Sequence, residues 1–173
     1  MRQYELPFDR KHSEDELKYH ILSKLSPHFN IQQEVKGFQS NKSINRRIDA
    51  VIKPKNTQDW AKKDVAFGIE FKGSMHSNKT RDVTSLFEQA MDYHHTDFNG
   101  LGRIPILICP LELPKGQDGF FFKRLLGRYG IGEIRPMANH GICIVFHEMH
   151  IIWSEKSGVK EGKTNMFKYQ KHH

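Results

Sequence analysis

The stretch RRIDAVIK…DVAFGIEFKG, from Arg46 to Gly73, contains two apolar segments that charged residues interrupt. Each segment has the β-branched and aromatic composition of a buried strand, and the polar run PKNTQDWAKK separates them as a loop. The charges inside the segments are Asp49, Glu70 and Lys72. A desolvated charge without a partner costs several kcal/mol, so we expect these residues to meet one another, a metal or water in a cleft.

The whole chain predicts one α/β domain over residues 1–155, followed by a basic, flexible tail over 156–173. Ser13 and Glu16 form a capping box at the start of the first helix. A helix between the third and fourth strands has the length of a right-handed crossover, so we expect those strands to be parallel neighbours, with the fourth in the middle of the sheet. The expected elements are a helix (13–25), three strands (29–38, 46–53 and 64–72), a helix (82–95), a strand (103–110), a further helix (119–130) and a closing β-hairpin (141–154).

Strand alternation gives the charges a geometry. Glu70 and Lys72 are two residues apart, so they project from the same face of the third strand. If the second and third strands pair as an antiparallel hairpin, Asp49 and Glu70 converge at one end. A hard divalent cation, Mg²⁺ or Mn²⁺, would remove the repulsion between the two carboxylates. With Lys72 beside it to orient the attacking water and neutralise developing charge, such a site suits phosphodiester hydrolysis.

The spacing of Asp49 and the triplet Glu70-Phe71-Lys72 resembles the signature of the PD-(D/E)XK nuclease superfamily. The proline that usually precedes the first acidic residue is replaced here by Ile48. The family's core order of helix, three strands, helix and strand matches the expected elements across residues 13–110, a little more than half of the chain. The resemblance implies a restriction-endonuclease-like α/β fold, with a central mixed sheet flanked by helices. This chain would add a helix and a C-terminal β-hairpin to that core.

The resemblance extends to two helices. Many members carry an acidic residue on the first helix, and archaeal-type Holliday junction resolvases have an E-x-E-L stretch there, which EDEL at 14–17 is similar to. Helical phase puts Glu14 on the inward face, so we carry the metal-site role to Glu14 and leave Glu16 as a cap. Gln89 and Tyr93 resemble the Q-x3-Y element of RecB-like and lambda-exonuclease-like members, in which the glutamine positions the lysine or the substrate phosphate. A half-buried helix flank is the alternative for this pair.

The charge balance favours a polyanionic partner. The chain has 27 Lys and Arg against 20 Asp and Glu, a formal net charge of +7, and basic proteins bind nucleic acid through counterion release. Cations in the loops beside the expected site could grip backbone phosphates, and an ordinary solvated surface is the alternative for each. These cations are Lys42, Arg46, Arg47, Lys79 and Arg81, and Tyr93 is also expected to contact nucleic acid.

The sequence thus predicts a Mg²⁺-dependent endodeoxyribonuclease. Asp49 and Glu70 would bind the metal, Lys72 would assist the attacking water, and Gln89 would position the lysine or the substrate phosphate. Mn²⁺ should substitute for Mg²⁺. DNA is the expected substrate, but no residue reads a 2′-hydroxyl or a base, so RNA stays open. The alternative is a module of the same fold that binds nucleic acid or a partner without turnover. One site per chain would favour a homodimer for cutting both strands of a duplex.

Targeting and redox signals are sparse. No run approaches the roughly 20 apolar residues of a membrane span, and MRQYELPFDRKH at the N-terminus lacks the apolar core of a signal peptide, so we expect no membrane partner and a cytoplasmic protein. Cys109 and Cys143 both lie in apolar runs. We therefore expect buried, reduced thiols.

Overall fold

The computed structural model describes residues 13–73, 80–113, 117–147 and 149–159. Within them the chain forms a nine-stranded mixed sheet, in the order β4-β1-β2-β3-β5-β6-β7-β8-β9, with three helices. The elements are α1 (Glu14–Leu25), β1 (Phe29–Gln39), β2 (Ile44–Pro54), β3 (Phe67–Phe71), α2 (Thr80–His94), β4 (Asp97–Phe98), β5 (Ile106–Cys109), α3 (Gln117–Arg128), β6 (Ile131–Met137), β7 (Gly141–Phe146), β8 (His150–Ser154) and β9 (Gly158–Val159).

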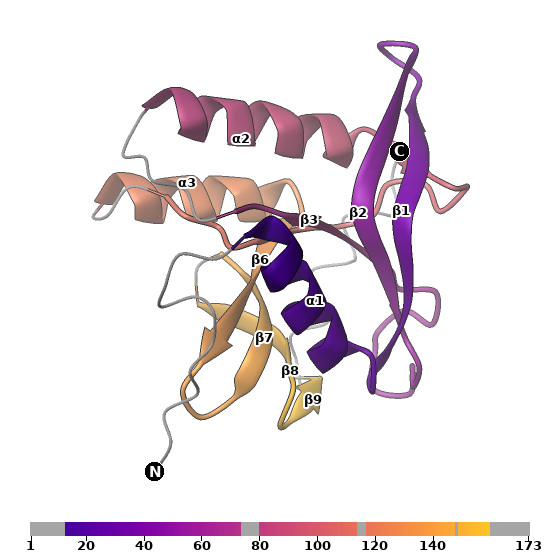
Figure 1. Ribbon diagram of the computed structural model, residues 1–173, viewed down its shortest axis with the longest axis vertical. Helices are drawn as coiled ribbons and strands as arrows, with labels where there is room; N and C mark the ends of the chain where they lie inside the picture. Colours follow the sequence, from indigo (N-terminus) through magenta and orange to yellow (C-terminus); the bar gives the residue numbers. More distant parts are fainter. Residues whose placement is uncertain (1–12, 74–79, 114–116, 148, 160–173) are drawn as a thin grey trace.

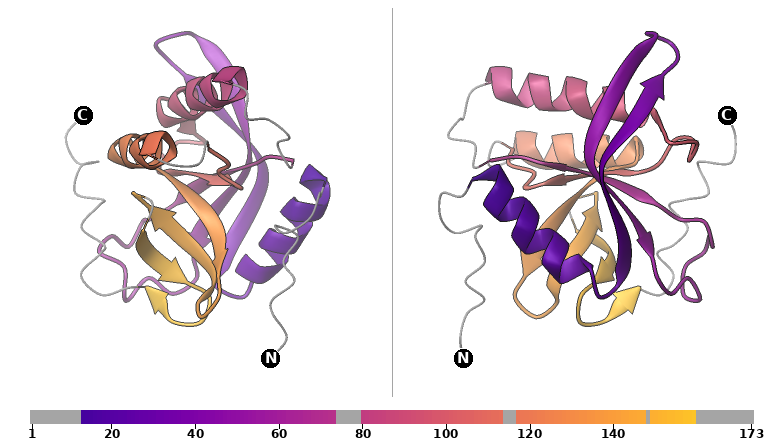
Figure 2. Two further views of the ribbon diagram at one scale, coloured as in Figure 1. Left: turned by 90° about the vertical axis from the view of Figure 1, so that its left-hand side faces the viewer. Right: turned by 45° about the vertical axis from the view of Figure 1, so that its right-hand side comes forward.

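The helices cover both faces of the curled sheet. Figures 1 and 2 show α1 on one face and α2 with α3 on the other. On the first face, Leu17 and Ile21 of α1 belong to the same hydrophobic cluster as Ile69 of β3. On the second, Leu86 of α2 and Leu126 of α3 share a cluster with β5. Because both faces are covered, the central strands read as unbroken apolar runs rather than alternating ones.

The central pairings follow the expected plan. β2 and β3 are antiparallel, β3 and β5 are parallel, and β5 is the fifth of the nine strands in the sheet. β6 also pairs with β5 in parallel, with α3 as the connection between them. The carboxyl ends of β3, β5 and β6 therefore lie along the same edge of the sheet.

Several local predictions are confirmed. The Ser13 hydroxyl accepts a hydrogen bond from the Glu16 backbone N–H, and the Glu16 carboxylate accepts one from the Ser13 N–H, which completes the capping box. β7 and β8 form the expected antiparallel hairpin. Glu148, expected near its turn, lies outside the described residues. Cys109 and Cys143 are buried thiols. None of the helices in the described ranges combines the length and apolarity needed to cross a membrane.

The sheet is larger than expected, although the α/β class with a mixed sheet and flanking helices is confirmed. β6 was not expected, because Gly132, Glu133 and Pro136 interrupt its apolar pattern. β4 and β9 have two residues each, too few to show a period. α2 begins at Thr80, before the expected start.

The β1–β2 hairpin projects beyond the C-terminal end of α2 (Figure 1). Asp92 of α2 holds the hairpin through two ion pairs. Lys42 Nζ and Arg46 Nη2 each lie 2.5 Å from one of the Asp92 carboxylate oxygens. Gln39 Nε2 donates to the same carboxylate at 3.4 Å. A single acidic residue thus anchors the projecting hairpin to α2.

Candidate active site

Asp49 lies where β2 separates from β3. The last pair of the β2–β3 ladder joins Ala50 to Ile69. One residue further on, Asp49 Oδ2 accepts a hydrogen bond from the Phe71 backbone N–H at 2.7 Å, so a side chain replaces the backbone acceptor. Phe71 is fully buried, and a buried N–H without an acceptor is costly. The fold therefore fixes the Asp49 carboxylate beside the end of β3.

Glu70 is held from β3 and from α2. It is 8% exposed, and its Oε1 accepts hydrogen bonds from Lys72 Nζ at 2.8 Å and Gln89 Nε2 at 2.7 Å. Gln89 Nε2 also lies 3.1 Å from the Tyr93 hydroxyl, which donates to the Arg47 carbonyl oxygen at 3.1 Å. Gln89 and Tyr93 thus share one face of α2, as expected, and they connect Glu70 to β2.

Burial raises the pKa of the Glu70 carboxyl. The hydrogen bond and charge of Lys72 act in the opposite direction, and the charge of Asp49 adds to the rise. Burial and the charge of Glu70 also raise the pKa of the Tyr93 hydroxyl, which keeps its proton for the Arg47 carbonyl. Asp49 and Glu70 are therefore close enough to interact, and a bound cation would relieve the cost of ionising Glu70.

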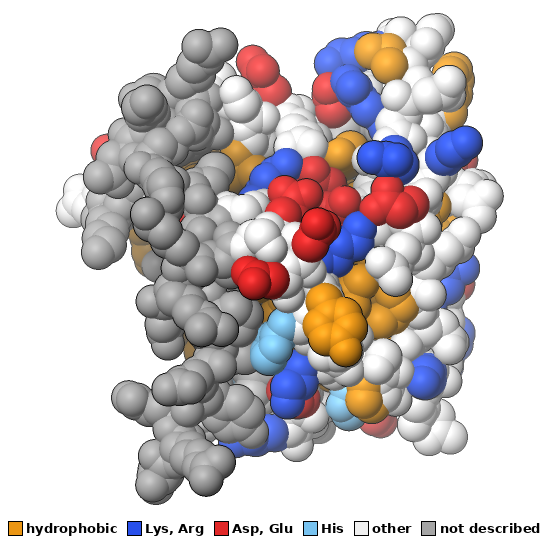
Figure 3. All heavy atoms as spheres, in the orientation of Figure 1, with side chains coloured by type: hydrophobic (Ala, Val, Ile, Leu, Met, Phe, Trp, Pro, Cys, Tyr) orange, Lys and Arg blue, Asp and Glu red, His pale blue; other side chains and the backbone are white. Residues whose placement is uncertain are grey.

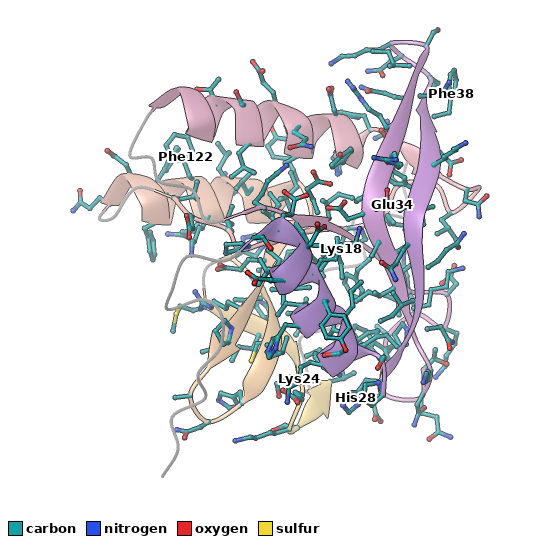
Figure 4. The ribbon with its side chains drawn as sticks, viewed as in Figure 1. Lys18, Lys24, His28, Glu34, Phe38 and Phe122 are labelled. Carbon is teal, nitrogen blue, oxygen red and sulfur yellow. The ribbon has the colours of Figure 1, made fainter. Side chains whose placement is uncertain are left out.

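A lysine that sequence reasoning missed also reaches this site. Lys18 Nζ lies 2.6 Å from Glu34 Oε1 and 3.6 Å from Asp49 Oδ1. Figure 4 shows Lys18 on α1 and Glu34 on the neighbouring β1–β2 hairpin. Burial acts to lower the pKa of Lys18, but the hydrogen bond to Glu34 and the charge of Asp49 raise it overall. The available signal was its spacing: Lys18 is four residues after Glu14, on the same helical face.

Glu34 has an unusual backbone conformation for a non-glycine residue. Its φ is 53°, in the left-handed region. The flanking pairs Gln33–Ala50 and Val35–Ile48 place it opposite Asp49 in the β1–β2 register. Backbone strain of this kind is often found at functional sites. Glu34, with its left-handed backbone, therefore lies directly opposite Asp49, the residue next to the last pair of the β2–β3 ladder.

Glu14 adjoins the site without joining the two carboxylates. It lies in the first turn of α1, is exposed, and its backbone nitrogen would be 3.9 Å from a Cβ placed on Gly73. Across the described ranges, no three His, Cys, Asp or Glu side chains form a group that could hold a metal ion. The protein ligands for a metal would therefore be Asp49 and Glu70. One or two carboxylates are the usual protein ligands of Mg²⁺, which keeps several waters.

The five expected phosphate-binding cations have different surroundings. Lys42 and Arg46 are paired with Asp92, as described above, and Arg47 Nε lies 3.0 Å from Glu34 Oε2. Lys79 lies outside the described residues, and Arg81 is in the first turn of α2, where the backbone alone is described. Lys42, Arg46 and Arg47 thus all come from the β1–β2 hairpin, and each pairs with an acidic residue.

The surface over the site has a mixed charge. Figure 3 shows Asp and Glu side chains gathered in the middle of this face, above α1, with Lys and Arg side chains around them. A cavity of about 240 Å³ adjoins Gln89 and Tyr93 on α2. A larger cavity, about 530 Å³, is lined by residues such as Lys36 and Arg103 and does not include the site's carboxylates. The smaller cavity does not include them either, and it adjoins the site only through Gln89, which donates to Glu70, and Tyr93.

Comparison with known proteins found no match to this chain among protein-family models, curated proteins or solved structures. The resemblance carried by Asp49 and Glu70-Phe71-Lys72 is thus neither supported nor contradicted by a relative. What the chain does has to be inferred from its own residues.

Proposed function

We propose that this chain is a metal-dependent nuclease that hydrolyses phosphodiester bonds, with DNA as the expected substrate. One observation carries the proposal. Glu70 is a nearly buried carboxylate whose pKa is raised by burial, yet it faces Lys72 and lies close to a second carboxylate, Asp49. Lys72 and Lys18 each lie beside one of these carboxylates, and two neighbouring carboxylates are the ligands that a hard divalent ion prefers.

The residues then have distinct roles. Asp49 and Glu70 would hold Mg²⁺, or Mn²⁺ in its place, and Glu14 would assist from the start of α1. The bound ion would polarise the scissile phosphate and lower the pKa of a water. Lys72, fixed by its hydrogen bond to Glu70, would orient that water and offset the charge that develops on the phosphate. Gln89 would keep Glu70 in position.

The fold supports the proposal at the level of its core. α1, β1, β2, β3, α2 and β5 follow the element order of the PD-(D/E)XK superfamily, apart from the short β4. Asp49 lies on the second strand, and Glu70 on the third is followed by Lys72. We therefore propose a divergent restriction-endonuclease-like protein whose sheet continues through β6 to β9.

Cleavage assays test this proposal. Labelled single-stranded, duplex and branched DNA, and matching RNA, would be incubated with the purified chain and Mg²⁺, Mn²⁺ or EDTA. We expect metal-dependent cleavage of DNA that Lys72→Met reduces by about 10²-fold or more, since one preorganised group that stabilises developing charge typically contributes this much. Lys24→Met is a matched control. Lys24 lies in the last turn of α1, at the opposite end of that helix from Glu14, and pairs with Glu155.

The outcomes separate the alternatives. Cleavage of RNA with no cleavage of DNA would make this an RNA-directed nuclease with the same machinery. Binding of nucleic acid with no uptake of Mn²⁺ in calorimetry and no cleavage would favour the non-catalytic module. If neither metal supports cleavage of any of these substrates, the nuclease proposal is wrong.

A further inference from the structure

β6 repeats the charged pattern of β3. Glu133 and Arg135 are two residues apart, as are Glu70 and Lys72. Glu70 is paired with Ile108 of β5, and Ile108 is paired with Glu133 of β6, so both glutamates lie in one row across three parallel strands. Residues in one row project from the same face of a sheet. Both carboxylates therefore face the layer of α2 and α3.

Glu133 is paired with two cations. Lys123 Nζ, from α3, lies 3.1 Å and 3.3 Å from its two carboxylate oxygens, and Arg135 Nη1 lies 3.2 Å from Oε1. The Glu133 carboxylate is 6% exposed, but Lys123 and Arg135 are 19% and 23% exposed. The two cations are thus partly exposed at the surface, whereas the Glu133 carboxylate that fixes them is buried. Arg135 also contacts the β7–β8 turn, with Nη2 3.6 Å from Met149 Sδ.

The location of this cluster suggests a ligand. Ligands of open α/β sheets bind outside the carboxyl ends of parallel strands. Glu133 is the last residue of β6 that pairs with β5, and Arg135 follows two residues later. Two strand spacings, about 10 Å, separate the row positions of Glu70 and Glu133. The cluster is therefore near the proposed catalytic carboxylates but built from separate residues.

We propose that Lys123 and Arg135 form a second phosphate-binding site, which takes another phosphate of the strand whose scissile phosphate lies at Glu70 and Lys72. This inference rests on the proposed nuclease function. A lysine ammonium has three donors, of which Glu133 accepts two, and the third can donate to a phosphate oxygen. Glu133 acts as a positioning residue. The substrate is then a polynucleotide strand rather than a mononucleotide.

Binding measurements test this site separately from catalysis. Fluorescence anisotropy would follow a labelled DNA single strand of about 12 nucleotides, and a dinucleotide, at several salt concentrations with EDTA present. For Lys123→Gln combined with Arg135→Gln, we expect the slope of log K against log salt for the long strand to become shallower by about 1.4, or 0.7 per lost contact. Binding of the dinucleotide should not change.

Two further variants serve as controls. Arg124→Gln removes the same charge from the next residue of α3, whose guanidinium lies 5.5 Å from the centre of the Phe120 ring, and should keep the wild-type slope. In the double variant the buried Glu133 carboxylate would lose both of its cations, which is costly for folding. Adding Glu133→Gln removes that unpaired charge, so we expect the triple variant to fold. This triple variant should show the same shallower slope.

The results distinguish this site from the nuclease proposal. If the double and triple variants keep the wild-type slope and affinity for the long strand, the second site is wrong and the Glu133 cluster only stabilises the fold. Hydrolysis of the dinucleotide and the long strand by wild type with Mn²⁺ tests the nuclease itself. Its absence would contradict the nuclease proposal, whatever the binding slopes show.

Discussion

Asp49 Oδ2 accepts the Phe71 backbone N–H at 2.7 Å, one residue beyond the last pair of the β2–β3 ladder. One of the two acidic residues of the proposed site therefore also takes part in the hydrogen bonding of the sheet. Its other oxygen, Oδ1, faces Lys18 at 3.6 Å. Oδ2 therefore contributes to the sheet and Oδ1 faces Lys18, so substitutions can separate the structural role of Asp49 from its chemical role.

Asp49→Ala should be less stable than Asp49→Asn. Alanine leaves the buried Phe71 N–H without an acceptor, at a cost of about 1–3 kcal/mol, whereas the asparagine amide oxygen can still accept it. Urea unfolding of both variants measures the difference. Both should lose metal-dependent cleavage because neither carries the negative charge. Equal stability of the two variants would show that the hydrogen bond contributes little.

Glu70→Gln should stabilise the protein at neutral pH. Because burial raises the pKa of Glu70, the folded protein holds this proton more tightly than the unfolded chain. The free energy of unfolding of wild type therefore falls as pH rises from the ordinary glutamate value through the raised pKa. Glutamine stays neutral and removes this part of the pH dependence.

Thermal unfolding from about pH 4 to about pH 8 measures this effect. Glu88→Gln, an exposed glutamate next to Gln89 on α2, is the matched control and should follow wild type. Mn²⁺ should raise the melting temperature of wild type and of Glu88→Gln more than that of Glu70→Gln. A Glu70→Gln variant less stable than wild type at neutral pH would contradict the effect assigned to burial.

Lys18→Met should make stability more dependent on metal. Without Lys18, Glu34 and Asp49 lose the cation that lies between them, so the metal-free protein should melt at a lower temperature at neutral pH. A divalent ion at Asp49 would restore that balance, and the rise in melting temperature on adding Mn²⁺ should exceed that of wild type. Lys18→Arg keeps the charge and should follow wild type. A Mn²⁺ response in Lys18→Met no larger than in wild type would show that Lys18 does not balance the charge of the metal site.

Asp92→Asn should strengthen binding to nucleic acid. Burial acts to raise the pKa of Asp92, but hydrogen bonds from Lys42 and Gln39 and the charge of Arg46 lower it overall, so the carboxylate is ionised at neutral pH. Removing its charge leaves Lys42 and Arg46 for phosphates, with higher affinity and a steeper salt dependence. Anisotropy titrations measure both quantities.

Asp59→Asn, an exposed aspartate in the loop between β2 and β3, makes the same charge change away from these pairs and is the control. If Asp92→Asn and Asp59→Asn bind equally, Lys42 and Arg46 do not contact the strand.

Prediction from sequence was strongest where charges interrupt apolar runs. Asp49, Glu70 and Lys72 stand out in buried strands, and the period of two places the last two on one face. The capping box and the Gln89–Tyr93 spacing are also local patterns, and the structure shows both. Each of these features depends on residues a few positions apart.

The missed features depend on contacts between distant segments. Lys18 meets Glu34 and Asp49 because α1 packs on the sheet, and Glu34 has a positive φ. A short sequence window reveals neither feature. Glu133 lies in the same row as Glu70 only through two parallel pairings. The role of Glu14 at the metal stays a prediction, because helical phase fixes a direction and not a distance to Asp49.

The outermost strands of the described sheet, β4 and β9, each have two residues. Long, flat edge strands offer backbone donors and acceptors to other chains and promote fibril formation, and very short edges are one way in which natural proteins prevent this. β4 pairs with only Gly37 and Phe38 of the eleven-residue β1, so the rest of the outer edge of β1 pairs with no other strand of the described sheet. A strand added from another chain would find its longest ladder there rather than at β4 or β9.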